Sequence, residues 1–164
     1  MFEFIKDIKE LENVESVEKI NKGYSKDEKF KIKLKNKDEY LLLRLSDISL
    51  YEQKEKEYEV ISKFSKLGFE MSKPISFGIC NDEKNMYILL SWIDGVDLSD
   101  ALPKLSSEEQ YLLGRKAGKI LKSIHSLKVD DKKFDDSLKI KILDKIEKYE
   151  SSDVRVENDS NFIE

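Results

Sequence analysis

The chain has 164 residues, 39% of them hydrophobic, which is enough for one domain or for one lobe and part of a second. Lys and Arg number 30 against 34 Asp and Glu, and both signs are interspersed along the chain, so no basic face and no nucleic-acid partner are expected. A single cysteine, Cys80, excludes an internal disulfide. No uncharged apolar stretch approaches the roughly 20 residues of a membrane span, and the start M-F-E-F-I-K lacks the layout of an export signal. We therefore predict a cytoplasmic protein with no membrane partner.

Hydrophobic patterning predicts an α+β fold. The expected strands are 14–20, 30–34, 40–45, 74–79 and 86–90, which would form a five-stranded antiparallel sheet. The expected helices are 3–12, 49–67, one that starts at Leu98, a long amphipathic one between Ser106 and Leu127, and 135–149. We expect the 3–12 helix to cover a sheet, and the polar tail to Glu164 to be loosely held.

Arg44 interrupts the apolar run 40–45. Because side chains alternate across a strand, Leu42 and Arg44 share one face. Arginine occurs at only three positions of the chain, so composition alone does not explain an arginine inside an apolar strand. The alternative is a strand-end residue that extends its charged end to water.

The stretch 87–102, Y-I-L-L-S-W-I-D-G-V-D-L-S-D-A-L, leaves a strand, crosses a connector and enters a helix. It resembles the hinge of the aminoglycoside phosphotransferase and choline kinase-like family, which has the protein kinase-like fold. The segment G-R-K-A-G-K-I-L-K-S-I-H-S-L resembles the first long helix of that family's C-terminal lobe. The resemblance implies a kinase-like N-lobe over 1–90, a hinge over 91–96 and a partial helical C-lobe over 97–164. On pattern alone, the connector could equally be a surface loop.

The resemblance implies that ATP or GTP, with Mg, is the cofactor, and it assigns residues to the phosphates. The hairpin that contains Gly23 and Ser25 would lie over the phosphates, although a lone glycine is more often a turn residue and the pattern G-x-G-x-x-G is absent. Arg44 replaces the lysine usual in the family, and a guanidinium can grip phosphate in two-pronged fashion. The family pairs this cation with a helix glutamate, and the segment E-Y-E-V-I selects Glu57, with Glu59 as the fallback. We therefore predict that Arg44 and Glu57 lie within about 6 Å of each other.

The resemblance also assigns residues to the nucleoside. Leu42 would floor the adenine pocket and Leu90 would close its back. Ser91 and Ile93 would present backbone groups to the base, and Asp97 would approach the ribose. Leu90 could instead be an ordinary core residue, and Asp97 could cap the helix that starts at residue 98.

Catalysis in this family depends on an H-G-D-x-x-x-x-N loop and a later Asp, and the sequence contains no His-x-Asp. We predict no catalytic and no metal-binding residue here, and interpret the chain as the N-terminal part of an aminoglycoside phosphotransferase-like kinase. Alone, it is expected to transfer no phosphate and to bind nucleotide weakly.

Two functions stay open at this stage. One is a kinase that transfers the γ-phosphate to a hydroxyl of a small molecule, aminoglycosides being the family's best-known substrates and antibiotic resistance the role this would imply. The other is a non-catalytic nucleotide- or protein-binding module of the same fold. A plain α+β interaction domain is a third, weaker hypothesis.

Overall fold

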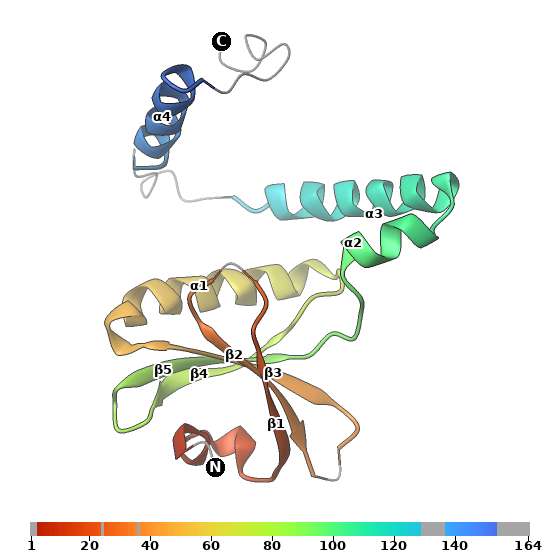
Figure 1. Cartoon of the computed structure of the whole chain (residues 1–164). Helices are drawn as coiled ribbons and strands as arrows, with labels where there is room; N and C mark the ends of the chain where they lie inside the picture. The colour runs from red at the N-terminus through yellow and green to blue at the C-terminus, as the bar shows by residue number, and fades with distance from the viewer. Residues whose placement is uncertain (1–2, 24, 36, 129–136, 154–164) are drawn as a thin grey trace. The chain divides into compact units, whose positions relative to one another are not determined.

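The computed structural model describes residues 3–23, 25–35, 37–128 and 137–153, and its central feature is a five-stranded antiparallel sheet (Figure 1). The strands are β1 (Val14–Ile20), β2 (Glu28–Leu34), β3 (Tyr40–Asp47), β4 (Pro74–Cys80) and β5 (Asn85–Ser91). Their order in the sheet is β1-β2-β3-β5-β4. All five predicted strands are present, so the predicted α+β fold is confirmed, and it is consistent with a kinase-like N-lobe.

Helices precede, interrupt and follow the sheet. The 3-10 helices are η1 (Glu3–Asp7), η2 (Lys9–Leu11), η3 (Ile48–Leu50), η4 (Ser65–Leu67) and η5 (Leu102–Lys104). The α-helices are α1 (Tyr51–Phe64), α2 (Leu98–Ala101), α3 (Ser107–His125) and α4 (Ser137–Glu150). Among the described residues, none of these helices has both the length and the apolar character to cross a bilayer.

The chain divides into two compact units, Met1–Ser126 and Leu127–Glu164. The sheet and the first three α-helices belong to the first unit, and α4 belongs to the second. Residues 135 and 136 of the predicted last helix and residues 154–164 of the predicted loose tail lie outside the described residues. The lobe and hinge boundaries inferred from the resemblance stay predictions.

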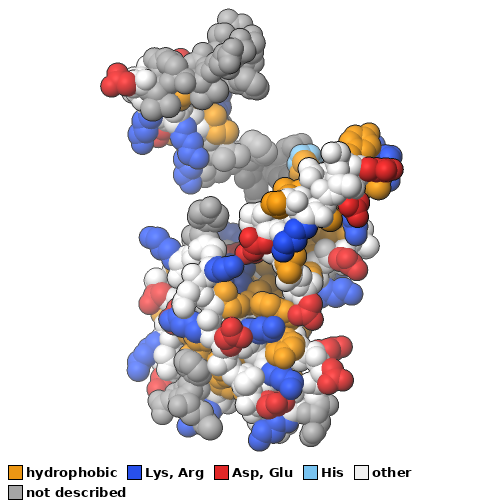
Figure 2. Space-filling view, turned by 45° about the vertical axis from the view of Figure 1, so that its right-hand side comes forward, with side chains coloured by type: hydrophobic (Ala, Val, Ile, Leu, Met, Phe, Trp, Pro, Cys, Tyr) orange, Lys and Arg blue, Asp and Glu red, His pale blue; other side chains and the backbone are white. Residues whose placement is uncertain are grey.

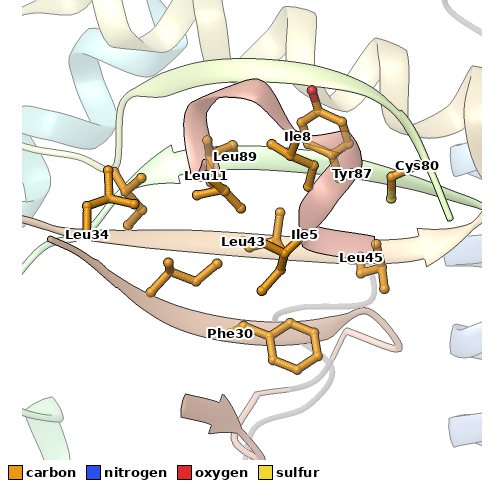
Figure 3. Packing of buried hydrophobic residues seen from close by; sticks show 12 residues of the cluster. Ile5, Ile8, Leu11, Phe30, Leu34, Leu43, Leu45, Cys80, Tyr87 and Leu89 are labelled. Carbon is orange, nitrogen blue, oxygen red and sulfur yellow. The ribbon is translucent and has the colours of Figure 1, made fainter. Parts of the chain in front are cut away.

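Two short 3-10 helices cover one face of the sheet (Figure 3). They bury Ile5, Ile8 and Leu11 against strand residues that include Phe30, Leu43 and Leu89. The prediction of one continuous helix over 3–12 was wrong, because Ile8 has an extended backbone, with φ -105 and ψ 104, between the two helices. The spacing of the three buried residues, three apart each time, is the three-residue turn of a 3-10 helix.

Helix α1 packs on the opposite face, over β5 and β4 (Figure 1). The rings of Tyr51 and Tyr58 lie 5.1 and 5.4 Å from the ring of Phe77, centroid to centroid. Leu42 packs with this cluster, whereas Leu41 and its alternate neighbours face the 3-10 helices. The predicted alternation along β3 is therefore confirmed, and it turns Arg44 toward α1.

Candidate functional site

Arg44 of β3 and Glu57 of α1 form an ion pair. Arg44 Nη1 lies 2.6 Å from a carboxylate oxygen of Glu57. The Arg44 side chain is 15% exposed and that of Glu57 is 33% exposed, so the pair lies at the edge of the interface rather than in open water. The predicted approach of these two residues is confirmed.

A second carboxylate, Asp27, binds the other edge of the same guanidinium. Asp27 directly precedes β2, and its side chain is only 4% exposed. Its carboxylate accepts hydrogen bonds from Arg44 Nε at 3.0 Å, from Arg44 Nη2 and from Ser46 Oγ at 2.8 Å. Lys54 of α1 donates to Asp27 at 2.8 Å and to Glu57 at 3.0 Å. We call Asp27, Arg44, Lys54 and Glu57 the charge network.

The charge network balances two carboxylates against two cations. Burial alone would raise the pKa of Asp27, but hydrogen bonds from Lys54, Arg44 and Ser46 outweigh it and lower that pKa to about 2. Burial also opposes ionisation of Glu57, yet Lys54 and Arg44 hold the pKa of Glu57 below its usual range. Both carboxylates of the charge network are therefore ionised at neutral pH.

Lys29 lies between Arg44 and the connection that joins β1 to β2. Gly23 has φ +103, a left-handed conformation that favours glycine. A Cβ built on Gly23 would lie 2.7 Å from Lys29 Nζ, which itself donates to the Lys22 carbonyl at 3.0 Å. Lys29 pairs with Arg44 across β2 and β3, so two cations share the sheet face beside this connection. Ser25, the other residue predicted in the connection, is exposed.

The connector after β5 leaves some backbone groups open and occupies others. The Ser91 N–H donates to the Lys73 carbonyl at 2.9 Å, and Ser91 Oγ accepts from the Lys73 N–H at 2.8 Å. Of the two backbone groups of Ser91, the N–H is therefore already bonded, and only the carbonyl could meet a base as predicted. No backbone hydrogen bond joins Ile93 to another described residue. Ile93 as a whole is 47% exposed.

Asp97 links the connector to the β1–β2 connection. Its carboxylate accepts from Lys22 Nζ at 2.8 Å, and both side chains are largely exposed. Asp97 occupies the position before α2, and its backbone carbonyl accepts from Asp100 at 3.0 Å and Ala101 at 3.1 Å. The predicted side-chain cap is absent, because the carboxylate turns to Lys22 instead of the helix N–H groups. The hydrogen bond and the charge of Lys22 lower the pKa of Asp97.

Lys31 occupies the face that carries Leu42, next to the connector. Lys31 pairs with Leu42 across β2 and β3, and its Nζ lies 4.0 Å from the ring centre of Tyr40 and 4.6 Å from that of Trp92. Such cation–π contacts hold the lysine against the apolar end of the face. Leu90 is buried in the cluster beneath α1, as either of its predicted roles requires.

The sequence interpretation did not identify Asp27, Lys54, Lys29 or Lys31 as part of this site. Strand parity was the available signal for three of them, because 27, 29 and 31 alternate with the buried Phe30. For Lys54 the signal was its position one helical turn before Glu57. Within the described residues, no group of three or more His, Cys, Asp or Glu side chains could hold a metal ion.

Comparison with known families decides the affiliation of the chain. A model of the phosphotransferase enzyme family matches residues 16–162. The chain belongs to the phosphotransferase enzyme family. The match runs from β1 into the second unit, which confirms the resemblance proposed from the hinge and the long helix. No curated protein and no solved structure gives a significant match to this phosphotransferase family member.

Proposed function

We propose that this phosphotransferase family member binds a nucleoside triphosphate, ATP or GTP, on the sheet face that carries Leu42 and Arg44. The Arg44–Glu57 ion pair between β3 and α1 carries this proposal. A guanidinium has five N–H donors, and carboxylates of the charge network accept from three of them, so two stay available to a phosphate.

The phosphate end of the proposed site is cationic. Lys29 neighbours Arg44 across the strands, and the connection containing Gly23 and Ser25 lies next to Lys29. Backbone N–H groups of such a connection can add to the attraction for phosphate. Charges of both signs mix over the remaining surface in view, so the attraction would be local (Figure 2).

The base end of the proposed site is apolar. Leu42 would floor the pocket, Leu90 would close its back, and the Ser91 carbonyl and Ile93 backbone would meet the base edge. Asp97 would bind the ribose in place of Lys22. Breaking the Lys22–Asp97 ion pair would cost little, because an exposed pair of this kind contributes little stability.

We infer that the bound phosphates carry Mg²⁺. Phosphate oxygens would be among its ligands, and its protein ligands would not come from the residues of the site given above. The cation would neutralise charge on the transferred group. The γ-phosphate would pass to a hydroxyl of a small molecule, for which an aminoglycoside is one candidate. We further propose lobe boundaries at 1–90, 91–96 and 97–164, and a cytoplasmic location.

Nitrogen-15 NMR titration of the 164-residue chain with ATP, GTP and adenosine tests nucleotide binding. ATP is expected to shift the indole N–H of Trp92, the only tryptophan, and the Nε–H of Arg44. Arg44→Gln should weaken ATP binding by at least about tenfold, because a charge-assisted contact to phosphate is lost. The matched control is Arg115→Gln on α3, which should change ATP affinity by less than about twofold.

The proposal would be supported by saturable shifts with either triphosphate whose affinity falls in Arg44→Gln and stays the same in Arg115→Gln. No saturable shift up to about 10 mM ATP or GTP, an affinity worth less than about 3 kcal/mol, would overturn it. Equal affinities of the Arg44→Gln variant and the unmodified chain would also overturn it.

A further inference from the structure

Asp27 is the most buried carboxylate of the charge network, and its hydrogen-bonding capacity is used up. Its two oxygens accept four hydrogen bonds, two from Arg44 and one each from Ser46 and Lys54. A carboxylate offers roughly four acceptor positions, so Asp27 has none left for a ligand or a metal. Any contribution of Asp27 to the site must therefore act through its protein neighbours.

The first neighbour is Arg44, whose orientation Asp27 fixes. Asp27 binds the edge formed by Nε and Nη2, while Glu57 binds Nη1 at 2.6 Å. Two contacts on different atoms of a planar group leave it no freedom to rotate. The two remaining N–H donors, one on each terminal nitrogen, thus have a fixed direction.

The second neighbour is helix α1, which Asp27 holds through Lys54. The Lys54 side chain is 8% exposed and bridges Asp27 and Glu57. Removal of the Asp27 charge would leave two cations in competition for Glu57 alone. Lys54 lies on the same helix as Glu57, one turn away and 3.0 Å from its carboxylate, so it can compete with Arg44 for Glu57.

The third neighbour is the β1–β2 connection. Asp27 follows Gly23 by four positions and immediately precedes β2, so its contacts tie the end of this connection to β3 and α1. A single side chain thereby joins three elements that surround the proposed phosphate position.

We propose that Asp27 is a positioning residue of the nucleotide site, which orients Arg44 and helix α1 before the phosphates arrive. This rests on the proposed function. Orientation in advance of binding avoids the ordering cost that a free arginine would incur when it meets phosphate. The effect is specific to ligands that carry phosphate, because the hydrogen bonds of Asp27 to described residues go to Arg44, Ser46 and Lys54, none of which belongs to the base end.

The test compares ATP with adenosine on the 164-residue chain by the same NMR titration. Asp27→Asn should raise the Kd for ATP by about tenfold and change the Kd for adenosine by less than about twofold. Glu28→Gln is the matched control: Glu28 is the next residue, pairs with Lys19 at the surface and should leave both values unchanged. The Nε–H resonance of Arg44 should move in Asp27→Asn without any ligand.

A double variant separates positioning from folding. Asp27→Asn with Lys54→Met removes one charge of each sign, so the Arg44–Glu57 pair stays balanced even if Asp27→Asn alone fails to fold. We expect this variant to keep adenosine affinity and to lose ATP affinity. In an Arg44→Gln background, Asp27→Asn should weaken ATP binding less than it does in the unmodified chain, because the part of its effect that acts through Arg44 is already lost.

Equal losses for ATP and adenosine in the double variant would overturn the proposal in favour of a structural role. Unchanged ATP affinity would overturn it as well, while leaving the proposed nucleotide site intact. A chain without Asp27 substitution that binds neither ATP nor GTP would overturn both proposals together.

Discussion

Asp27 illustrates how a single buried charge can be stable beside an apolar core. Two cations and one hydroxyl donate to its carboxylate, and they more than compensate for the loss of water around it. Removing one partner of such a group costs more than the pair itself contributes, since an uncompensated charge stays behind. The charge network therefore behaves as one unit rather than as four separate contacts.

The lowered pKa of Asp27 predicts a specific pH dependence of stability. A carboxyl whose pKa is lower in the folded state contributes stability above its unfolded pKa and loses it as the pH falls through its folded pKa. Lowering the pKa of Asp27 from 3.8 to about 2 stabilises the folded state by about 2 kcal/mol at neutral pH. About half of this stabilisation is lost by pH 3. Urea unfolding should show the unmodified chain more stable than Asp27→Asn at pH 7, with the difference narrowing below about pH 4.

The control for this pH dependence is Glu28→Gln, whose stability difference from the unmodified chain should stay small throughout. Glu28 is half-exposed, and its ion pair with Lys19 is accessible to solvent and salt. A difference for Asp27→Asn that stays constant from pH 7 to pH 3 would contradict the assignment of a strongly lowered pKa to Asp27.

Part of the site could be predicted because it is marked by local sequence patterns or by the resemblance to a known family. An arginine inside an apolar strand and the family's helix glutamate were enough to pair Arg44 with Glu57. Asp27 lies in the segment S-K-D-E-K-F, where strand parity separates it from Glu28, but its contact with Arg44 cannot be predicted until the register of β2 is known. Contacts made 17 and 27 residues away depend on sheet pairing and helix placement, which local patterns do not determine.

At the scale of elements, strands were predicted more accurately than helix types. The bounds of β1 agree with the prediction at both ends, although its apolar residues Val14, Val17 and Ile20 are three apart and do not alternate. A spacing of three fits both an α-helix and a 3-10 helix over ten residues, so the sequence does not separate the two, and the structure has the tighter turn in η1 and η2.

The pairing of β4 with β5 requires a glycine opposite Tyr87. Gly78 pairs with Tyr87, and a Cβ built on Gly78 would lie 3.0 to 3.2 Å from three atoms of its side chain. Tyr87 is only 8% exposed and cannot move away freely. Gly78→Ala should therefore lower the free energy of unfolding by about 1–3 kcal/mol, as overpacking does, which urea unfolding would measure.

Gly114→Ala on α3 is the matched control for the substitution at Gly78. No described atom beyond the helix lies within 4 Å of a Cβ built on Gly114, and alanine favours a helix over glycine by about 1 kcal/mol. This variant should keep or raise the helical circular dichroism signal. A Gly78→Ala variant as stable as Gly114→Ala would show that Tyr87 does not restrict β4.

At the scale of the first unit, the sheet and α3 differ in how much surface they bury. Strands β3 and β5 are covered on both faces, and Leu43 and Leu89 have no exposed surface. No residue of α3 is buried, and Tyr111, Leu112 and Leu121 on this helix are at least half exposed. Local stability follows buried contacts, so α3 should open without unfolding of the sheet.

Native-state hydrogen exchange measures this difference directly. The amides of Ile88 and Leu89 should exchange only through global unfolding, whereas amides in the middle of α3 should exchange at least about a hundredfold faster after correction for sequence. Leu89→Ala should speed the exchange of sheet amides by an amount equivalent to about 2–5 kcal/mol and leave α3 unchanged. Leu121→Ala, the control on the exposed helix, should leave the sheet unchanged. Equal protection of α3 and β5, or a common response of both to Leu89→Ala, would mean that helix and sheet unfold together despite the exposed surface of α3.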